Sequence, residues 1–144
     1  TEILRLGEWP QAHEETMPYT HNRVFENANM AEIEERTRRS LAEAGFGVLT
    51  EIDVKATMKA KIDVDLQAYR ILGACNPTMA HRAIELEPRI GAMLPCNVIL
   101  REVENGIEVS AIDPVASMLA IENDDLTRLA AEVRDLLVRA IDKL

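Results

Sequence analysis

The sequence has few cysteines, a minority of basic side chains and no long apolar run, and each shortage excludes a class of protein. Cys75 and Cys96 form no CxxC pair, so a thioredoxin-like motif is absent and a structural zinc site would need other ligands. The 25 acidic side chains outnumber the 16 basic ones, and the net charge of −9 repels phosphate backbones and anionic lipid surfaces. We therefore expect neither a nucleic-acid partner nor a membrane partner.

No apolar run approaches the roughly 18 residues of a membrane span, and the chain does not open with a basic segment followed by an apolar one. This predicts a cytoplasmic protein with free thiols, although a start at Thr1 is compatible with a removed signal peptide. With 144 residues, 47% of them hydrophobic, the chain is typical of one globular domain. We expect an N-terminal extension over residues 1–18 and a single α+β domain over residues 19–144.

Two amphipathic helices stand out from the pattern of apolar residues. Asn29 followed by Glu32 resembles a capping box, and one apolar stripe follows it until Gly45, which terminates the helix. The last helix opens at Asn123 or Asp124 and carries acidic residues early and basic residues late, which matches the helix dipole. These are the two main helices of the predicted domain.

The strands are predicted from period-two alternation and from turn residues. A short peripheral helix is expected from Val54 to about Lys61, between the second and third strands. The element order is then β-α-β-β-β-β-α with short extra helices. The predicted strands are a weak one at Met17 to Phe25, followed by Phe46 to Val54, Tyr69 to Asn76, Cys96 to Val103 and Ile107 to Ile112.

Two strands end in the same device, an Asx residue followed by proline. Asn76-Pro77 and Asp113-Pro114 both read as an N-cap with proline at the first helical position, where the missing N–H has no consequence. A strand that ends at Cys75 should therefore pass directly into a helix. A short helix through Met118 and Ile121 should follow the second pair.

The dipeptide Asn105-Gly106 predicts a two-residue type I′ hairpin between the last two strands. In the register that follows, Val98 lies opposite Asp113. Asp113 then shares a face with Cys96, one diagonal away. This register predicts that Cys96 and Asp113 are neighbours.

Four stretches closely resemble the domain-of-unknown-function family 302: residues 45–59, 69–77, 94–98 and 110–114. The resemblance covers about Tyr19 to Leu144. It implies a compact α+β domain with an antiparallel sheet and two main helices, and a fold similar to the TATA-binding-protein half-repeat. It does not imply DNA binding, which the acidic charge opposes. The family has no settled activity, so the resemblance supplies no catalytic residues.

The leading functional hypothesis is a small binding domain, forming a homodimer, that holds a small-molecule ligand between the sheet and the turn from Cys75 to His81. The hairpin edges and the apolar connector Ile90 to Pro95 favour the homodimer. We expect no cofactor and no metal under this hypothesis. The residues that the element order could gather at one end of the sheet are Cys75, Asn76, His81, Cys96, Asn97 and Asp113.

Three alternatives stay open at this point. The first is a thiol-dependent enzyme or redox protein, because Cys75 directly precedes a predicted helix start, with Cys96 as resolving thiol or Asp113 as acid/base partner. The second is a metal site that adds His81 or Asp113 to both thiolates. The third is structural: buried cysteines as small core residues, and Asn76 and Asp113 only as helix caps.

Overall fold

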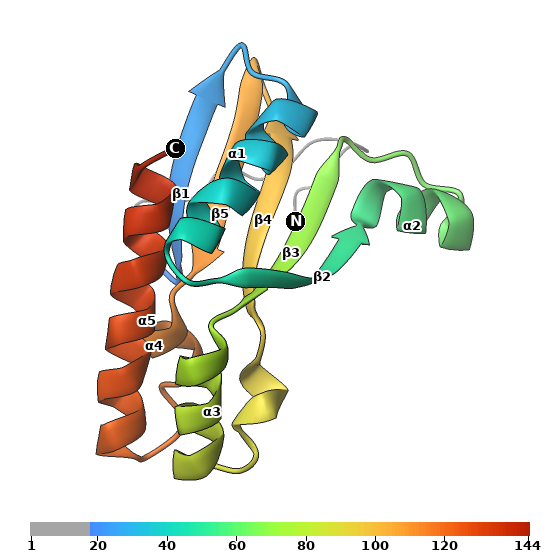
Figure 1. Cartoon of the computed structure of the whole chain (residues 1–144). Coiled ribbons are helices and arrows are strands. Elements are labelled where there is room, and N and C mark those ends of the chain that lie inside the picture. Colours follow the sequence, from blue (N-terminus) through green and yellow to red (C-terminus); the bar gives the residue numbers. More distant parts are fainter. Residues whose placement is uncertain (1–17) are drawn as a thin grey trace.

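The computed structural model describes residues 18–144, which form an α+β domain (Figure 1). The predicted class and the β-α-β-β-β-β-α order of the main elements are confirmed. The predicted extension over residues 1–18 lies, except for Pro18, outside the described residues. The elements are β1 (Thr20–Glu26), α1 (Met30–Glu43), β2 (Gly47–Asp53), α2 (Val54–Ile62), β3 (Tyr69–Cys75), α3 (Pro77–Leu86), the 3-10 helix η1 (Ile90–Met93), β4 (Cys96–Val103), β5 (Gly106–Ile112), α4 (Pro114–Ser117) and α5 (Asp124–Asp142).

The sheet has five antiparallel strands in the order β1-β5-β4-β3-β2. The first strand therefore does not pair with the second: Thr20 of β1 pairs with Ile112 of β5, and β1 and β2 form opposite edges. β1 begins three residues later than predicted and ends one residue later, at Glu26. The two strands that carry the cysteines, β3 and β4, lie side by side within the sheet.

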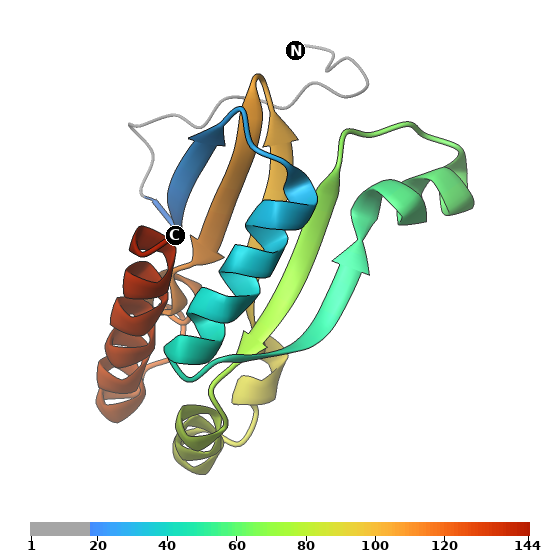
Figure 2. The same ribbon diagram turned by 45° about the horizontal axis from the view of Figure 1, so that its top comes forward.

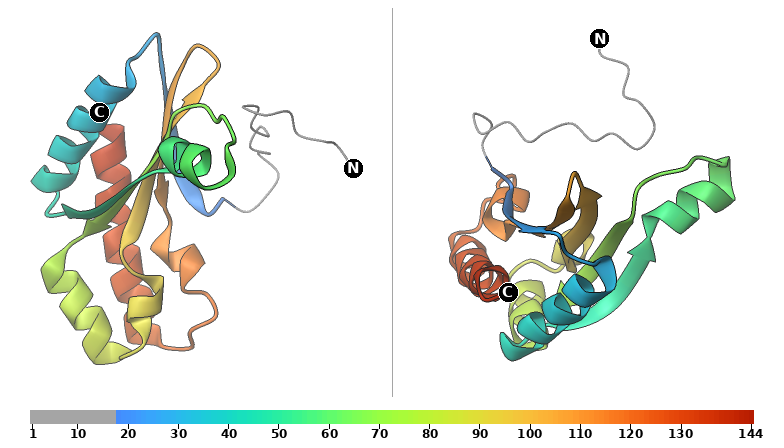
Figure 3. Two further views of the ribbon diagram at one scale, coloured as in Figure 1. Left: turned by 90° about the vertical axis from the view of Figure 1, so that its right-hand side faces the viewer. Right: turned by 90° about the horizontal axis from the view of Figure 1, so that it is seen from above.

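Both main helices pack on one face of the sheet, as the edge-on view in Figure 3 shows. Alternate residues of the three inner strands point toward them and are buried, which is the period-two pattern of a half-covered sheet. The main core consists of Ile33 and Leu41 from α1, Leu137, Ala140 and Ile141 from α5, and Phe46, Leu72, Ala74, Cys96, Val98, Leu100, Ile107, Val109 and Ala111.

A second, smaller core lies below the sheet in Figure 1, where α3, η1, α4 and the first half of α5 meet. Its buried side chains are Ala83, Ile90, Met118, Leu126, Leu129 and Ala130. The ends of β3 and β4 lead directly into this region. The space between the two cores is therefore bounded by the strand ends and by three helices.

The predicted helix starts are confirmed by their capping hydrogen bonds. Asn29, Asn76 and Asn123 each accept a bond from the backbone N–H three residues later, at 3.2, 3.2 and 3.0 Å. Asp113 caps α4 by accepting from Val115 N at 2.9 Å. Only the extent of α4 differs, because this helix ends at Ser117 rather than near Ile121.

The predicted register of the β4–β5 hairpin is wrong by two residues. Val98 pairs with Ala111, whereas we expected it opposite Asp113. A shift of two leaves every side chain on its predicted face, since side chains in a strand alternate with period two. The shift places Asp113 beyond the paired part of the hairpin, where its N–H donates instead to the carbonyl of Tyr19 at 2.8 Å.

The cause of the shift is the turn. Val103 pairs with Gly106, so the two-residue loop consists of Glu104 and Asn105. Among the described residues of this turn only Asn105 has a positive φ, of 62°, and a type I′ turn requires two. Gly106 is needed for a different reason, because a Cβ there would lie 2.3 Å from the carbonyl oxygen of Phe25 in β1.

β2 is less buried than its alternating sequence predicts. The pairing of β2 with β3 shifts between Val48 and Thr50, so the residues on either side of Leu49 do not continue one regular face. Leu49 is 68% exposed and Ile52 is 47% exposed. The helix α2 that follows has no buried residue and projects beyond the sheet in Figures 1 and 2, as a peripheral element should. No helix in residues 18–144 is long and apolar enough to cross a membrane.

Candidate functional site

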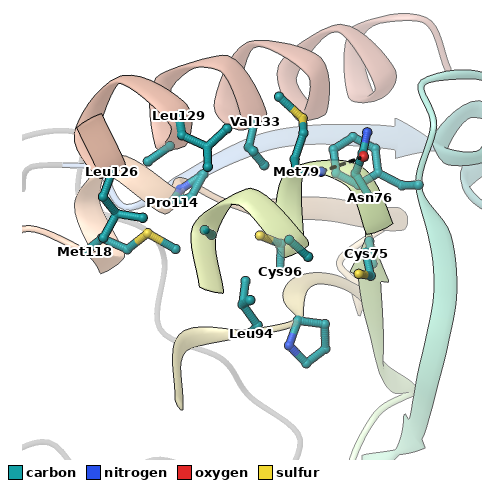
Figure 4. A pocket seen from close by; sticks show the side chains of 16 residues that line it. Cys75, Asn76, Met79, Leu94, Cys96, Pro114, Met118, Leu126, Leu129 and Val133 are labelled. Atoms are coloured by element: carbon teal, nitrogen blue, oxygen red, sulfur yellow. Dashed lines mark hydrogen bonds between the residues drawn. The ribbon is translucent and has the colours of Figure 1, made fainter. Parts of the chain in front are cut away.

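A cavity lies at the junction of the two cores, where β3 and β4 meet α3, α4 and α5 (Figure 4). Its volume is about 40 Å³, and it opens to the surface. Most of the wall is hydrocarbon. The lining residues are Phe46, Ala74, Cys75, Asn76, Met79, Ala80, Ala83, Leu94, Pro95, Cys96, Pro114, Met118, Leu126, Leu129, Ala130 and Val133.

The strand-to-helix junction at Asn76 shapes one wall of the cavity. Ala74 pairs with Cys96 across the sheet, so Cys75 is the next residue along β3 and its side chain belongs to the opposite pleat from that of Cys96. The Asn76 side chain then accepts from Met79 N and fixes the start of α3. The Asx-Pro device thus brings a thiol, an amide and a thioether to one wall within five residues.

Asn76 also fits closely against the turn that follows α1. Gly45 has a φ of +91°, and a Cβ built there would lie 3.0 Å from Asn76 Nδ2. The left-handed conformation and this close approach both favour glycine. The next residue, Phe46, is 2% exposed and lines the cavity. The turn therefore packs against Asn76 and contributes Phe46 to the cavity wall.

The two cysteine thiols lie in different environments. Cys96 is buried, with 6% of its surface exposed, whereas Cys75 is half-buried. Burial raises the pKa of the Cys96 thiol to about 11, and the neighbouring Cys75 adds to the rise. Without a cation beside it, Cys96 is therefore a protonated thiol at neutral pH.

Three of the six predicted site residues, Cys75, Asn76 and Cys96, line this cavity. Asn97 is exposed and belongs to the opposite pleat of β4 from Cys96. His81 does not line the cavity: its side chain is 75% exposed, and Nδ1 lies 3.1 Å from Glu85 Oε1 on the same helix. The structure thus gathers the residues next to the strand ends and leaves His81 and Asn97 outside.

Asp113 does not line the cavity of the two thiols either. It borders a separate hollow of about 180 Å³, together with His21 and Arg134. Its carboxylate caps α4, while the next residue, Pro114, lines the cavity in its place. Asp113 thus does not share a cavity with Cys75, whose acid/base partner it was predicted to be, or with Cys96, its predicted neighbour.

Within the part of the chain that the structure describes, no group of three or more His, Cys, Asp or Glu residues could hold a metal ion. The thiols have no imidazole or carboxylate beside them among the residues of the cavity wall. The arrangement provides apolar contact, two thiols and an amide whose oxygen already serves as a helix cap.

The methionines and the α5 side chains of this site could not be identified from the sequence. Met79 is the third residue after Asn76 and lies in the first turn of α3, and Met118 is the fifth residue after Asp113 and directly follows α4. Leu126, Leu129 and Val133 belong to the apolar stripe of the last helix, which the sequence does show. What it does not show is that part of the stripe faces a cavity rather than the sheet.

Comparison with known proteins identifies a family but no activity. No curated protein matches the chain. A solved structure described as the crystal structure of an uncharacterized conserved protein DUF302 from Bacillus stearothermophilus is similar, with a TM-score of 0.80 and 25% sequence identity. The similarity covers 86% of this chain and 96% of that one. The model of the family called domain of unknown function DUF302 matches residues 21–144, which confirms the resemblance seen in the sequence. The chain belongs to the DUF302 family of domains of unknown function.

Proposed function

We propose that this protein is a binding domain that takes a small ligand into the cavity at the ends of β3 and β4. The observation that supports this proposal is the apolar hollow itself, which opens to the surface and carries two thiols in its wall. Ligand sites are typically concave and mostly apolar, with a few polar groups that orient the ligand.

The volume limits what can enter. An engineered apolar cavity of about 150 Å³ accepts benzene or xenon. The volume here is about 40 Å³, much smaller than that cavity, so a ligand of benzene's size or larger enters fully only if the wall moves. Met79 and Met118 are unbranched and flexible, so their side chains can adapt the wall to an occupant.

The alternative of a thiol enzyme that uses Cys75 stays a prediction. Nucleophilic cysteines are activated by a nearby base or cation. His81 pairs with Glu85 on the surface of α3, and Asp113 caps α4 beside another hollow. Because neither residue lines the cavity of the thiols, ligand binding is the function that the geometry supports better.

Xenon titration of the folded protein tests the proposal. We expect saturable shifts of the methyl NMR signals of Met79, Met118 and Leu126. Ala80→Leu should lower xenon affinity about tenfold or more, because the larger side chain extends into the cavity from α3. Ala42→Leu is the matched control, since Ala42 is exposed on α1. Shifts that do not saturate, or that are the same in the Ala80→Leu variant, would refute a cavity that binds ligand.

We further propose that two copies associate through β2, in the cytoplasm. β2 is an edge strand whose outer backbone groups can pair with the same strand of a second copy, and its Leu49 and Ile52 are exposed. Sedimentation equilibrium should give twice the chain mass of 16.1 kDa. Ile52→Lys should shift the protein toward the monomer, because lysine on an edge disfavours strand pairing. A monomeric mass for the unmodified protein would contradict the homodimer.

A further inference from the structure

The wall of the cavity is polar at its rim and apolar at its inner end. Cys75 and Asn76 are half-buried and stand on one side of the space in Figure 4, whereas Met118 and Leu126 are buried and stand on the opposite side. Among the described residues of the wall, the one other polar side chain is Cys96, whose thiol stays uncharged at neutral pH because burial raises its pKa to about 11. A ligand therefore meets polar groups where it enters and hydrocarbon further in.

Alanine at four positions of the wall leaves the space open. Ala83 and Ala130 are 5% and 3% exposed, so they belong to the buried part of the wall. Each carries a single methyl group where other positions of the wall carry Leu or Met, so these two residues limit how far a ligand can extend inward. The four alanines are Ala74 in β3, Ala80 and Ala83 in α3, and Ala130 in α5.

We infer that the cavity takes the unbranched alkyl chain of an uncharged amphipathic molecule, with the chain directed inward and the polar head at Cys75 and Asn76. This inference rests on the proposed binding function and names the class of its ligand. A primary alcohol of medium chain length has the chemistry that the wall fits.

The composition of the wall favours an uncharged head. The described lining residues include no Lys, Arg, His, Asp or Glu, so a charged head would find no partner of opposite sign in the wall. The net charge of −9 also repels an anion such as a carboxylate. A hydroxyl or amide head requires no such partner, because it can keep hydrogen bonds to water at the rim.

The small volume favours a chain over a ring. At about 40 Å³ the cavity takes a ring only if the wall moves apart over the full width of that ring. An unbranched chain has the width of one methylene group along its whole length, so it requires the least movement of the wall. Met79 and Met118 can supply this movement by rotation, since methionine is unbranched and flexible.

A titration of the whole chain with four probes, followed by methyl NMR, tests the inference. From 1-butanol to 1-hexanol we expect the affinity to rise about fourfold with each methylene group, the ratio that corresponds to burial of one CH₂. Cyclohexanol and hexanoate should each bind about tenfold more weakly than 1-hexanol, because the ring overpacks the wall and the carboxylate finds no cation there. Hexanoate that binds as tightly as 1-hexanol would overturn the uncharged head, and cyclohexanol that does so would overturn the unbranched chain.

Ala130→Val should remove most of the gain in affinity from 1-butanol to 1-hexanol, because the larger side chain fills the inner end of the cavity. Ala131→Val is the matched control, since Ala131 is the next residue of α5 and does not line the cavity. Circular dichroism must show that the variants are folded, and Ala83→Val on α3 repeats the test at the second buried alanine. An unchanged dependence on chain length in the folded variants would contradict the inference.

Nuclear Overhauser effects between probe and protein give the direction of the chain. The terminal methyl group of bound 1-hexanol should contact the methyl groups of Ala83 and Ala130, and its hydroxyl-bearing carbon should contact half-buried Ala80. The reverse pattern would overturn the inward direction. If xenon enters the cavity and the alcohols show no dependence on chain length, the ligand class is refuted and the binding function stands. If neither xenon nor the alcohols enter, both are refuted.

Discussion

Phe46→Ala is expected to lower the free energy of unfolding by about 3–5 kcal/mol, the usual range for removing a buried aromatic side chain. Phe46 is 2% exposed and packs in the main core, and it also lines the cavity. Removal of the ring therefore deletes apolar contacts and enlarges the cavity that the ring lines. Urea denaturation followed by circular dichroism measures the loss as a lower midpoint with an unchanged slope.

Leu49→Ala is the control for this variant, because Leu49 lies three residues further along the chain and is 68% exposed. Its effect should stay within about 0.5 kcal/mol. The Phe46→Ala variant that still folds should bind xenon more strongly than the unmodified protein, since its cavity is larger. A loss of stability below about 1 kcal/mol would show that Phe46 is not the tightly packed core residue described here.

Gly106→Ala should destabilise the protein by about 1–3 kcal/mol or more, the range for overpacking a well-packed site. The new Cβ would lie 2.3 Å from the carbonyl oxygen of Phe25, and this backbone atom cannot rotate away as a side chain can. β1 must therefore move off β5. The effect is steric, since Gly106 does not have a positive φ. Hydrogen exchange should show reduced protection of the β1 amides.

Gly47→Ala is the matched control for this substitution. Gly47 also lies in a strand without a positive φ, and a Cβ there meets nothing within 4 Å. Alanine should be neutral at this position, or stabilising by about 0.4–1 kcal/mol through the unfolded chain. Equal destabilisation by both substitutions would mean that the loss arises from the glycines' backbone freedom and not from contact with β1.

The helices and strands could be predicted from the sequence, but the pairing of the strands in the sheet could not. Caps act locally, so Asn29, Asn76, Asp113 and Asn123 could be assigned to helix starts from a few neighbouring residues. The place of β1 beside β5 depends on contacts between distant segments, which no local period records. The β4–β5 turn is a second example, because its loop consists of Glu104 and Asn105 and does not include Gly106. Glycine is needed at position 106 because β1 approaches it closely, and this contact between distant segments is not visible in the local sequence.

The residues of the candidate site were likewise only partly predictable from the sequence. Cys75, Asn76 and Cys96 could be placed together because they lie at the ends of two strands that pair with each other. Asp113 was misplaced because its position was calculated from an assumed turn, and a two-residue error moved it past the end of the ladder. Met118 and the α5 side chains could not be predicted, because a buried apolar residue looks the same in sequence whether it faces packed atoms or a cavity.

The pairing of β1 with β5 also determines when the protein can fold during synthesis. β1 leaves the ribosome long before β5, and α5, which supplies a large part of both cores, emerges later still. Until then the apolar faces of β3, β4 and α1 have no complete covering, so the nascent chain exposes apolar surface until α5 has emerged. Chaperone contact with the growing chain should accordingly persist until Asp142 has emerged and should end soon afterwards.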